Sequence, residues 1–325
     1  GDNNSGLGAY SNYNVTTGVS NTALGYSSGL YNEAGNYNTF VGTQSGQGAS
    51  GQSNTGNVGV GYQTLLDITD GGYNVAIGYQ SGQNITSADE CISIGTNSLN
   101  NATVAQNCIA IGRNAMQEVT TNALDGAIAI GYGALIGASG TTTGANNTVA
   151  IGKDSLKVLT TGVGNVAIGH ESGKTITTTS GNTIVGHSAA TSGTIGADNT
   201  IVGNDAFNAN ISSAASCVVV GKSALAAAHT QTGTVAIGKS ALASCTSGNW
   251  NVGVGYTALT ANSTGDANTA LGFEALKTNV TGDGNTAIGY AAGNTYNTSN
   301  GTGNNTAIGS NASFHNATGL NNTMV

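Results

Sequence analysis

The sequence predicts an all-β protein, a parallel β-solenoid or β-roll of about 18 coils, on three observations. A phrase close to Asn-Thr-Ala-Ile-Gly recurs along the whole chain, and 12 of the 17 intervals between its glycines are 17 residues long. Each phrase alternates apolar and small residues, which is the period-two pattern of a strand. A 17-residue unit cannot bury a core by itself, so it must stack on its neighbours.

Composition supports the same class. Glycine supplies 52 of the 325 residues, proline is absent, and only 7% of residues are charged. Collagen requires abundant proline, and helical bundles require better helix formers than Gly, Asn and Thr. The net charge of −8 argues against nucleic acid as a partner, and no apolar run is long enough for a membrane span. We expect one continuous domain over residues 1–325, forming part of a longer array.

Within each strand, two apolar columns flank a column of small residues. The position before the repeat glycine is Ile, Val or Leu, and the position two residues earlier is mostly Val, Ile or Thr. We expect these two columns to fill the coil interior and the small residues between them to point outward. The outward residues would form a smooth strip for close packing of a second chain, most readily in a trimer. The predicted oligomer interface comprises Ala76, Ala110, Ala129, Ala150, Ala167, Ala270, Ala287 and Ala307.

Three further columns complete the predicted coil. Asn recurs four residues before the glycine, where side-chain amides can hydrogen-bond from coil to coil. The glycine itself is expected to form a sharp corner. Ser or Ala three residues after the glycine, often followed by Leu, makes a second short apolar segment. Every interval longer than 17 residues places its extra residues in the turn half of the coil.

The strand phrases resemble the head repeat of YadA-like trimeric autotransporter adhesins, a repeat also found in phage and viral fibre proteins. The resemblance rests on copies such as 74–78, 285–289 and 305–309, each close to Asn-Thr-Ala-Ile-Gly. It implies a left-handed parallel β-roll, three chains side by side, and binding to host or matrix surfaces. The 17-residue coil is longer than the usual coil of that family, and no coiled-coil stalk or membrane anchor is visible.

A candidate ligand-binding stripe occupies the position directly after the repeat glycine, which we call the aromatic–basic column. Aromatic rings can stack on sugars, and cations can meet acidic groups. The alternative is a half-exposed column filled by ladders of similar residues. The candidate residues are Tyr62, Tyr79, Tyr132, Lys153, His170, His187, Lys222, Lys239 and Tyr256.

No residue pattern indicates catalysis, a resident metal or a cofactor, so the sequence favours a protein that is not an enzyme. Cys91 and Cys108 stand in the Asn column of adjacent coils, either as small buried residues or as a pair. Asp266 and Asp283 share another column, either as solvated acids or as calcium ligands.

The sequence therefore predicts an extracellular structural and adhesive rod, at a cell or virion surface, that binds itself and a host surface, matrix or glycan. Two alternatives stay open at this point. One is a subunit of a homopolymeric extracellular filament, and the other is a glycan-binding or glycan-cleaving phage tail fibre.

Overall fold

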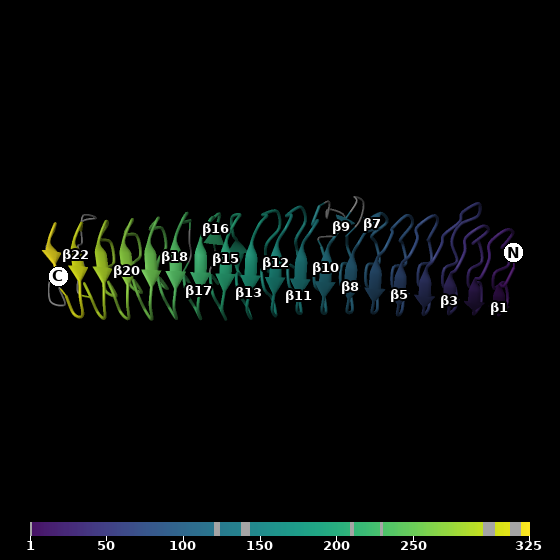
Figure 1. Cartoon of the computed structure of the whole chain (residues 1–325), viewed down its shortest axis with the longest axis horizontal. Helices are drawn as coiled ribbons and strands as arrows, with labels where there is room; N and C mark the ends of the chain where they lie inside the picture. Colours follow the sequence, from purple (N-terminus) through teal and green to yellow (C-terminus); the bar gives the residue numbers. More distant parts are fainter. Residues whose placement is uncertain are drawn as a thin grey trace. The chain divides into compact units, whose positions relative to one another are not determined.

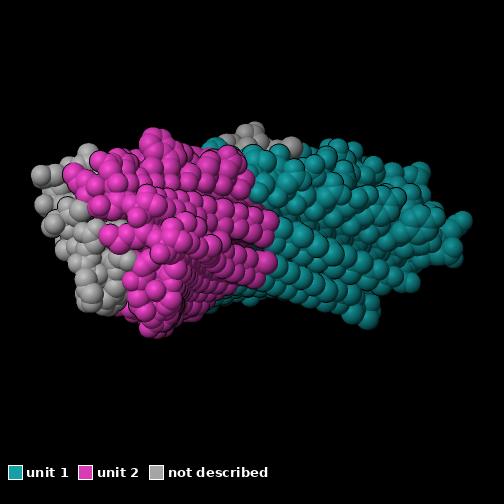
Figure 2. Space-filling model, turned by 60° about the vertical axis from the view of Figure 1, so that its left-hand side comes forward, with its two compact units in different colours: residues 1–164 teal, residues 165–325 magenta. Residues whose placement is uncertain are grey.

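A computed structural model describes residues 2–119, 124–137, 144–208, 211–227, 230–294, 303–312 and 320–325. Over these residues the chain is a parallel β-solenoid of about 17 turns without any helix, which confirms the predicted fold class. The chain divides into two compact units, Gly1–Gly164 and Asn165–Val325 (Figure 2). The single continuous domain stays a prediction.

Unit 1 contributes nine strands to a parallel sheet, and each strand pairs with the one from the next coil (Figure 1). Paired residues hold equivalent repeat positions, as in Ile92↔Ile109. The strands are β1 (Ser5–Leu7), β2 (Thr22–Leu24), β3 (Thr39–Val41), β4 (Val58–Val60), β5 (Val75–Ile77), β6 (Ile92–Ile94), β8 (Ile109–Ile111), β10 (Ile128–Ile130) and β11 (Val149–Ile151). In the turn half, β7 (Ala105–Gln106) pairs in parallel with β9 (Leu124–Asp125).

Unit 2 repeats the arrangement with ten strands. They are β12 (Val166–Ile168), β13 (Thr183–Val185), β15 (Thr200–Val202), β17 (Val218–Val220), β18 (Val235–Ile237), β19 (Val252–Val254), β20 (Thr269–Leu271), β21 (Thr286–Ile288), β22 (Thr306–Ile308) and β23 (Thr323–Met324). β14 (Gly193–Thr194) pairs with β16 (Ile211–Ser212) in its turn half. The first insertion, near residues 46–56, lies between β3 and β4 as expected, and the other insertions fall partly outside the described residues.

The two faces of the strands are the reverse of those predicted from the sequence. In the three-residue strands from β2 to β22 the middle residue points into the coil and is buried, whereas the flanking Ile, Val, Leu and Thr lie on the outer face. The predicted interface strip is therefore wrong in its orientation, because its alanines are fully buried within the single chain: Ala76, Ala110, Ala129, Ala150, Ala167, Ala270, Ala287 and Ala307.

The reversal has a steric cause. In many coils a leucine four residues after the repeat glycine fills the coil from the opposite wall, and the middle residue packed against it is small. A Cβ on Gly253 would lie 3.2 Å from Leu242 Cδ1, for example. Where the middle residue is large, as at Phe40, glycine replaces the leucine at Gly29 and Gly46, and each would bring a Cβ against the Phe40 ring. A large side chain on one wall of the narrow core is therefore matched by a small residue on the opposite wall.

The predicted asparagine ladder is confirmed. Asn57 Oδ1 accepts hydrogen bonds from the backbone N–H of Asn74 at 2.9 Å and from its Nδ2 at 3.1 Å. The same Nδ2 donates to the Ala88 carbonyl at 2.6 Å, so one side chain links three segments of the fold. In unit 2 the pattern recurs between Asn268 and Asn285, at 2.9 and 3.0 Å. Because these asparagines are buried, their hydrogen bonds are needed to avoid unpaired polar groups.

The corners of the coil use left-handed backbone at repeated positions. Gly78 has φ of +130°, and a Cβ placed there would lie 2.8 Å from the Gly95 carbonyl carbon, so conformation and close approach both require glycine. Non-glycine residues also adopt positive φ at the other corners, including the core leucines Leu65 and Leu135 at 49° and 48°. Left-handed backbone costs such residues about 1–2 kcal/mol each, and burying a leucine side chain offsets this cost.

Candidate functional site

The aromatic–basic column follows the corner glycine and lies on the surface, as the repeat predicts. Its geometry is set by the corner, because each glycine stacks on the next and carries the following residue with it. In unit 1 the Tyr62 and Tyr79 rings stack with centroids 5.3 Å apart and planes 16° from parallel. Tyr132 lies beneath a cation, with the Arg113 guanidinium 5.8 Å from its ring centroid.

Unit 2 contains a longer run of stacked rings in the same column. His170 and His187 stack at 4.9 Å, and Tyr256, Phe273 and Tyr290 form a continuous stack with successive spacings of 5.2 Å. The Lys239 ammonium group lies 5.5 Å from the Tyr256 ring centroid, at the start of that stack. The structure therefore brings these predicted site residues into contact with their column neighbours.

Arg113 is a column residue that the sequence interpretation missed, although its position directly after Gly112 was the available signal. Lys153 occupies the equivalent position in unit 1, and its Nζ lies 4.0 Å from the carboxylate of the adjacent Asp154. Lys222 and Lys239 occupy neighbouring coils of unit 2.

Stacking determines what the column can bind. Carbon atoms in contact lie about 3.5–4.0 Å apart, so a spacing near 5 Å leaves no room for a ligand ring between two stacked rings. The column presents ring edges, hydroxyl groups and cations to solvent, rather than open aromatic faces. It can therefore donate hydrogen bonds and meet negative groups, whereas face-on stacking of sugars within a continuous run is sterically blocked.

The outer face of the sheet is the second candidate site. Over β4, β5, β6, β8, β10 and β11 both outward positions are aliphatic in every strand, and all are partly exposed: Val58, Val60, Val75, Ile77, Ile92, Ile94, Ile109, Ile111, Ile128, Ile130, Val149 and Ile151. We call this set the aliphatic face of unit 1. Unit 2 has the same arrangement, with Thr at several of the outward positions.

The acidic columns have structural partners. Asp283 Oδ1 accepts a hydrogen bond from the Asp266 backbone N–H at 2.7 Å, and Asp266 Oδ1 accepts one from the Asn249 N–H at 2.6 Å. In the column two residues after the glycine, Glu171 pairs with Lys174 at 2.7 Å and Glu274 pairs with Lys277 at 2.8 Å. These carboxylates stabilise the coil or pair with a lysine on the same loop.

The four cysteines are buried free thiols. Cys91 continues the asparagine ladder by donating its backbone N–H to Asn74 Oδ1 at 3.0 Å. A hydrogen bond to Cys108 and burial raise the pKa of the Cys91 thiol above its usual range. Burial raises the pKa of Cys245 to about 11. The raised pKa makes the Cys91 and Cys245 thiols poor nucleophiles, because the reactive species is the thiolate.

Neither a scan against protein-family models nor a search of curated proteins found a match for this chain. Among the described residues, no three His, Cys, Asp or Glu side chains lie close enough together to hold a metal ion. The same part of the chain has no helix of the length and hydrophobicity that a membrane crossing requires.

Proposed function

We propose that the protein is a structural and adhesive module of an extracellular fibre, which associates laterally with copies of itself and presents its aromatic–basic column to a surface. The aliphatic face of unit 1 carries the proposal. Its side chains lie side by side over six neighbouring strands and all are partly exposed, and a contiguous exposed apolar patch marks an interaction site.

The extent of the face also suits an interface between chains. A stable interface buries about 800 Å² per partner, and the outward residues of β2 and β3 extend the aliphatic face within unit 1. The side chains of the face form regular rows, because the strands pair with equivalent residues opposite one another, as in Ile109↔Ile128. A second copy carries the same repeat spacing, so its ridges can fit between those of the first. The resemblance to trimeric adhesin heads favours three chains.

The adhesive role rests on the aromatic–basic column. Its cations and hydroxyl groups lie on the surface, one per coil. A target with a repeating structure can therefore form several weak contacts with successive coils at once. Multivalent contact of this kind raises affinity without any single strong site. Lys222 and Lys239 are cations on adjacent coils, and we take them as the first residues to test for this role.

Light scattering after size-exclusion chromatography tests self-association. We expect the wild-type chain to have the mass of a small closed oligomer, near three chains, at micromolar concentration. Ile77→Lys places a charge on the aliphatic face and should shift the mass toward one chain. Val104→Lys is the matched control, because Val104 and Ile77 lie in the same unit and are 36% and 39% exposed.

Several results would contradict the proposal or redirect it. A wild-type monomer at micromolar concentration would exclude lateral self-association, and equal effects of the two lysine variants would remove the aliphatic face from the interface. A mass that grows steadily with concentration would favour the filament alternative. Adhesion is measured separately on matrix-coated surfaces, where replacing Lys222 and Lys239 by alanine should reduce retention at low salt.

A further inference from the structure

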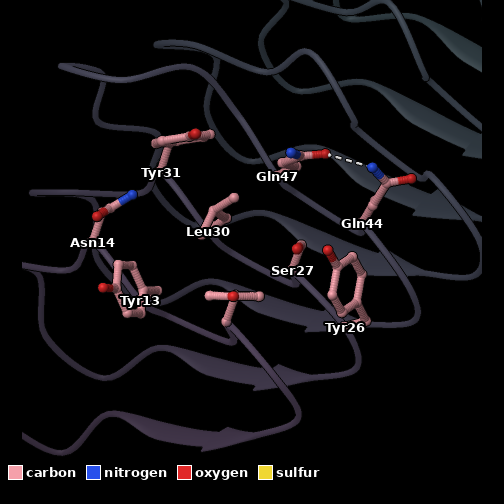
Figure 3. A pocket seen from close by; sticks show the side chains of 9 residues that line it. Tyr13, Asn14, Tyr26, Ser27, Leu30, Tyr31, Gln44 and Gln47 are labelled. Carbon is pink, nitrogen blue, oxygen red and sulfur yellow. Dashed lines mark hydrogen bonds between the residues drawn. The ribbon is translucent and has the colours of Figure 1, made fainter.

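A pocket with a cavity volume of about 410 Å³ opens on the first three coils of unit 1 (Figure 3). This volume lies within the range of small-molecule sites, about 300–1,000 Å³. Four tyrosines line it together with amide side chains: Tyr10, Tyr13, Tyr26, Tyr31, Gln44 and Gln47. None of the lining residues is charged.

Tyr26 belongs to the aromatic–basic column, but the ring contacts in this pocket are edge to face rather than stacked. Tyr10 meets Tyr13 edge to face, with centroids 5.5 Å apart and planes at 77°. It meets Tyr26 in the same manner at 5.9 Å and 84°. Edge-to-face packing leaves ring faces uncovered, and both Tyr10 and Tyr26 are about half exposed, at 53% and 52%. The pocket therefore offers open aromatic faces in two nearly perpendicular orientations.

The polar groups of the pocket are held in place but have hydrogen-bonding capacity left. Gln63 Nε2 donates to Gln44 Oε1 at 2.9 Å, and Gln44 Nε2 donates to Gln47 Oε1 at 3.1 Å, which orients both lining amides. The Gln47 Nε2 group, the Asn14 side-chain amide and the four phenol hydroxyls make no hydrogen bond to any described residue. Donors and acceptors thus surround the open ring faces.

Three of the four tyrosines depart from the repeat, so the fold does not require them. Tyr10 and Tyr13 stand two and five residues after Gly8, and Tyr31 stands six residues after Gly25. No other repeat glycine in the sequence is followed by tyrosine at any of these three distances. Equivalent positions elsewhere hold varied residues, including Glu171, Leu66 and Asn84, and their coils form the same parallel solenoid. Three local departures that converge on one cavity indicate a binding site.

We propose that this pocket binds a ring of a neutral saccharide. A sugar ring has a C–H face that matches an open tyrosine ring, and a rim of hydroxyl groups that matches phenols and amides. The uncharged lining favours neutral sugars over acidic ones, because no cation is present to compensate a carboxylate. The inference rests on the adhesive role proposed above and supplies a ligand class for it.

Titration calorimetry and saturation-transfer NMR test the pocket with neutral tetrasaccharides of glucose, galactose and N-acetylglucosamine as probes, and with a sialic acid oligomer as the acidic probe. We expect at least one neutral probe to bind the wild-type chain. Tyr10→Ala and Tyr26→Ala should each weaken that binding about tenfold, because each removes one ring face. Tyr73→Ala is the matched control, since Tyr73 is 66% exposed in the same unit but lies outside both the pocket and the aromatic–basic column.

The outcomes separate this inference from the proposed function. Failure of every neutral probe to bind, preference for the acidic probe, or equal losses in Tyr10→Ala and Tyr73→Ala would each overturn the saccharide site. Retained self-association and surface adhesion in Tyr10→Ala would then leave the fibre role intact. Tyr10→Phe keeps the ring face and should bind within a few-fold of the wild-type chain, which separates lost stacking from a folding defect.

Discussion

Replacing one buried asparagine should loosen the solenoid locally by a predictable amount. Asn74→Ala removes the Oδ1 acceptor of the Cys91 backbone N–H, which is 3.0 Å away, and the Nδ2 donor to the Ala88 carbonyl at 2.6 Å. It also removes the second donor to Asn57 Oδ1. The side chain is buried, so water cannot readily replace these partners.

The magnitude follows from the groups left unpaired. An orphaned buried backbone group costs about 1–3 kcal/mol, and the variant leaves one N–H and weakens the pairing of one carbonyl. We therefore expect a destabilisation of about 2–4 kcal/mol in the coils that contain residues 57–91. Repeat arrays can open locally, so a single global unfolding free energy is not the right quantity to measure.

Native-state hydrogen exchange is the appropriate assay. The Cys91 amide should lose protection by about 30- to 1,000-fold in Asn74→Ala, because that free-energy range corresponds to those factors. Asn107→Ala is the matched control, since Asn107 is exposed and its Nδ2 donates only to the exposed Asp125 carboxylate at 3.0 Å. If Cys91 protection in Asn74→Ala equalled that in Asn107→Ala, the ladder would not stabilise the fold as argued.

Three other predictions follow from burial, corner geometry and titration. Ala167→Asp should destabilise the fold by several kcal/mol, because it buries a charge. Ile168→Asp should change the melting temperature little, because Ile168 is 38% exposed on the outer face. A larger loss of stability in Ile168→Asp than in Ala167→Asp would support the faces predicted from the sequence, with the aliphatic residues inside. Gly78→Ala should destabilise far more than Gly164→Ala in urea unfolding, because both have positive φ but a Cβ at Gly164 meets nothing within 4 Å. With the Cys245 pKa raised to about 11 from 9.0, the folded state favours the protonated thiol, so its contribution to stability is present below pH 9 and lost as the pH rises toward 11. Thermal melts over that interval should fall more steeply for the wild-type chain than for Cys245→Asn, and parallel slopes would contradict this.

Much of this protein could be predicted from local spacing alone. The 17-residue period predicts the solenoid, because stacked coils place equivalent residues side by side whatever their detailed conformation. The asparagine ladder and the stacking of Tyr62 on Tyr79 follow from the same rule. Column membership is therefore a property of the sequence, and the structure confirms it.

The direction in which each column points was decided only by tertiary structure. A three-residue strand has two faces, and period-two alternation cannot say which of them is inside when large aliphatic residues alternate with alanine. The answer depends on the opposite wall of the coil, where Leu242 crowds the space beside Gly253 and where Gly46 makes room for Phe40. The tyrosine pocket depends on tertiary structure in the same way, because Tyr10, Tyr26 and Gln47 come from three successive coils and meet only after the chain has folded.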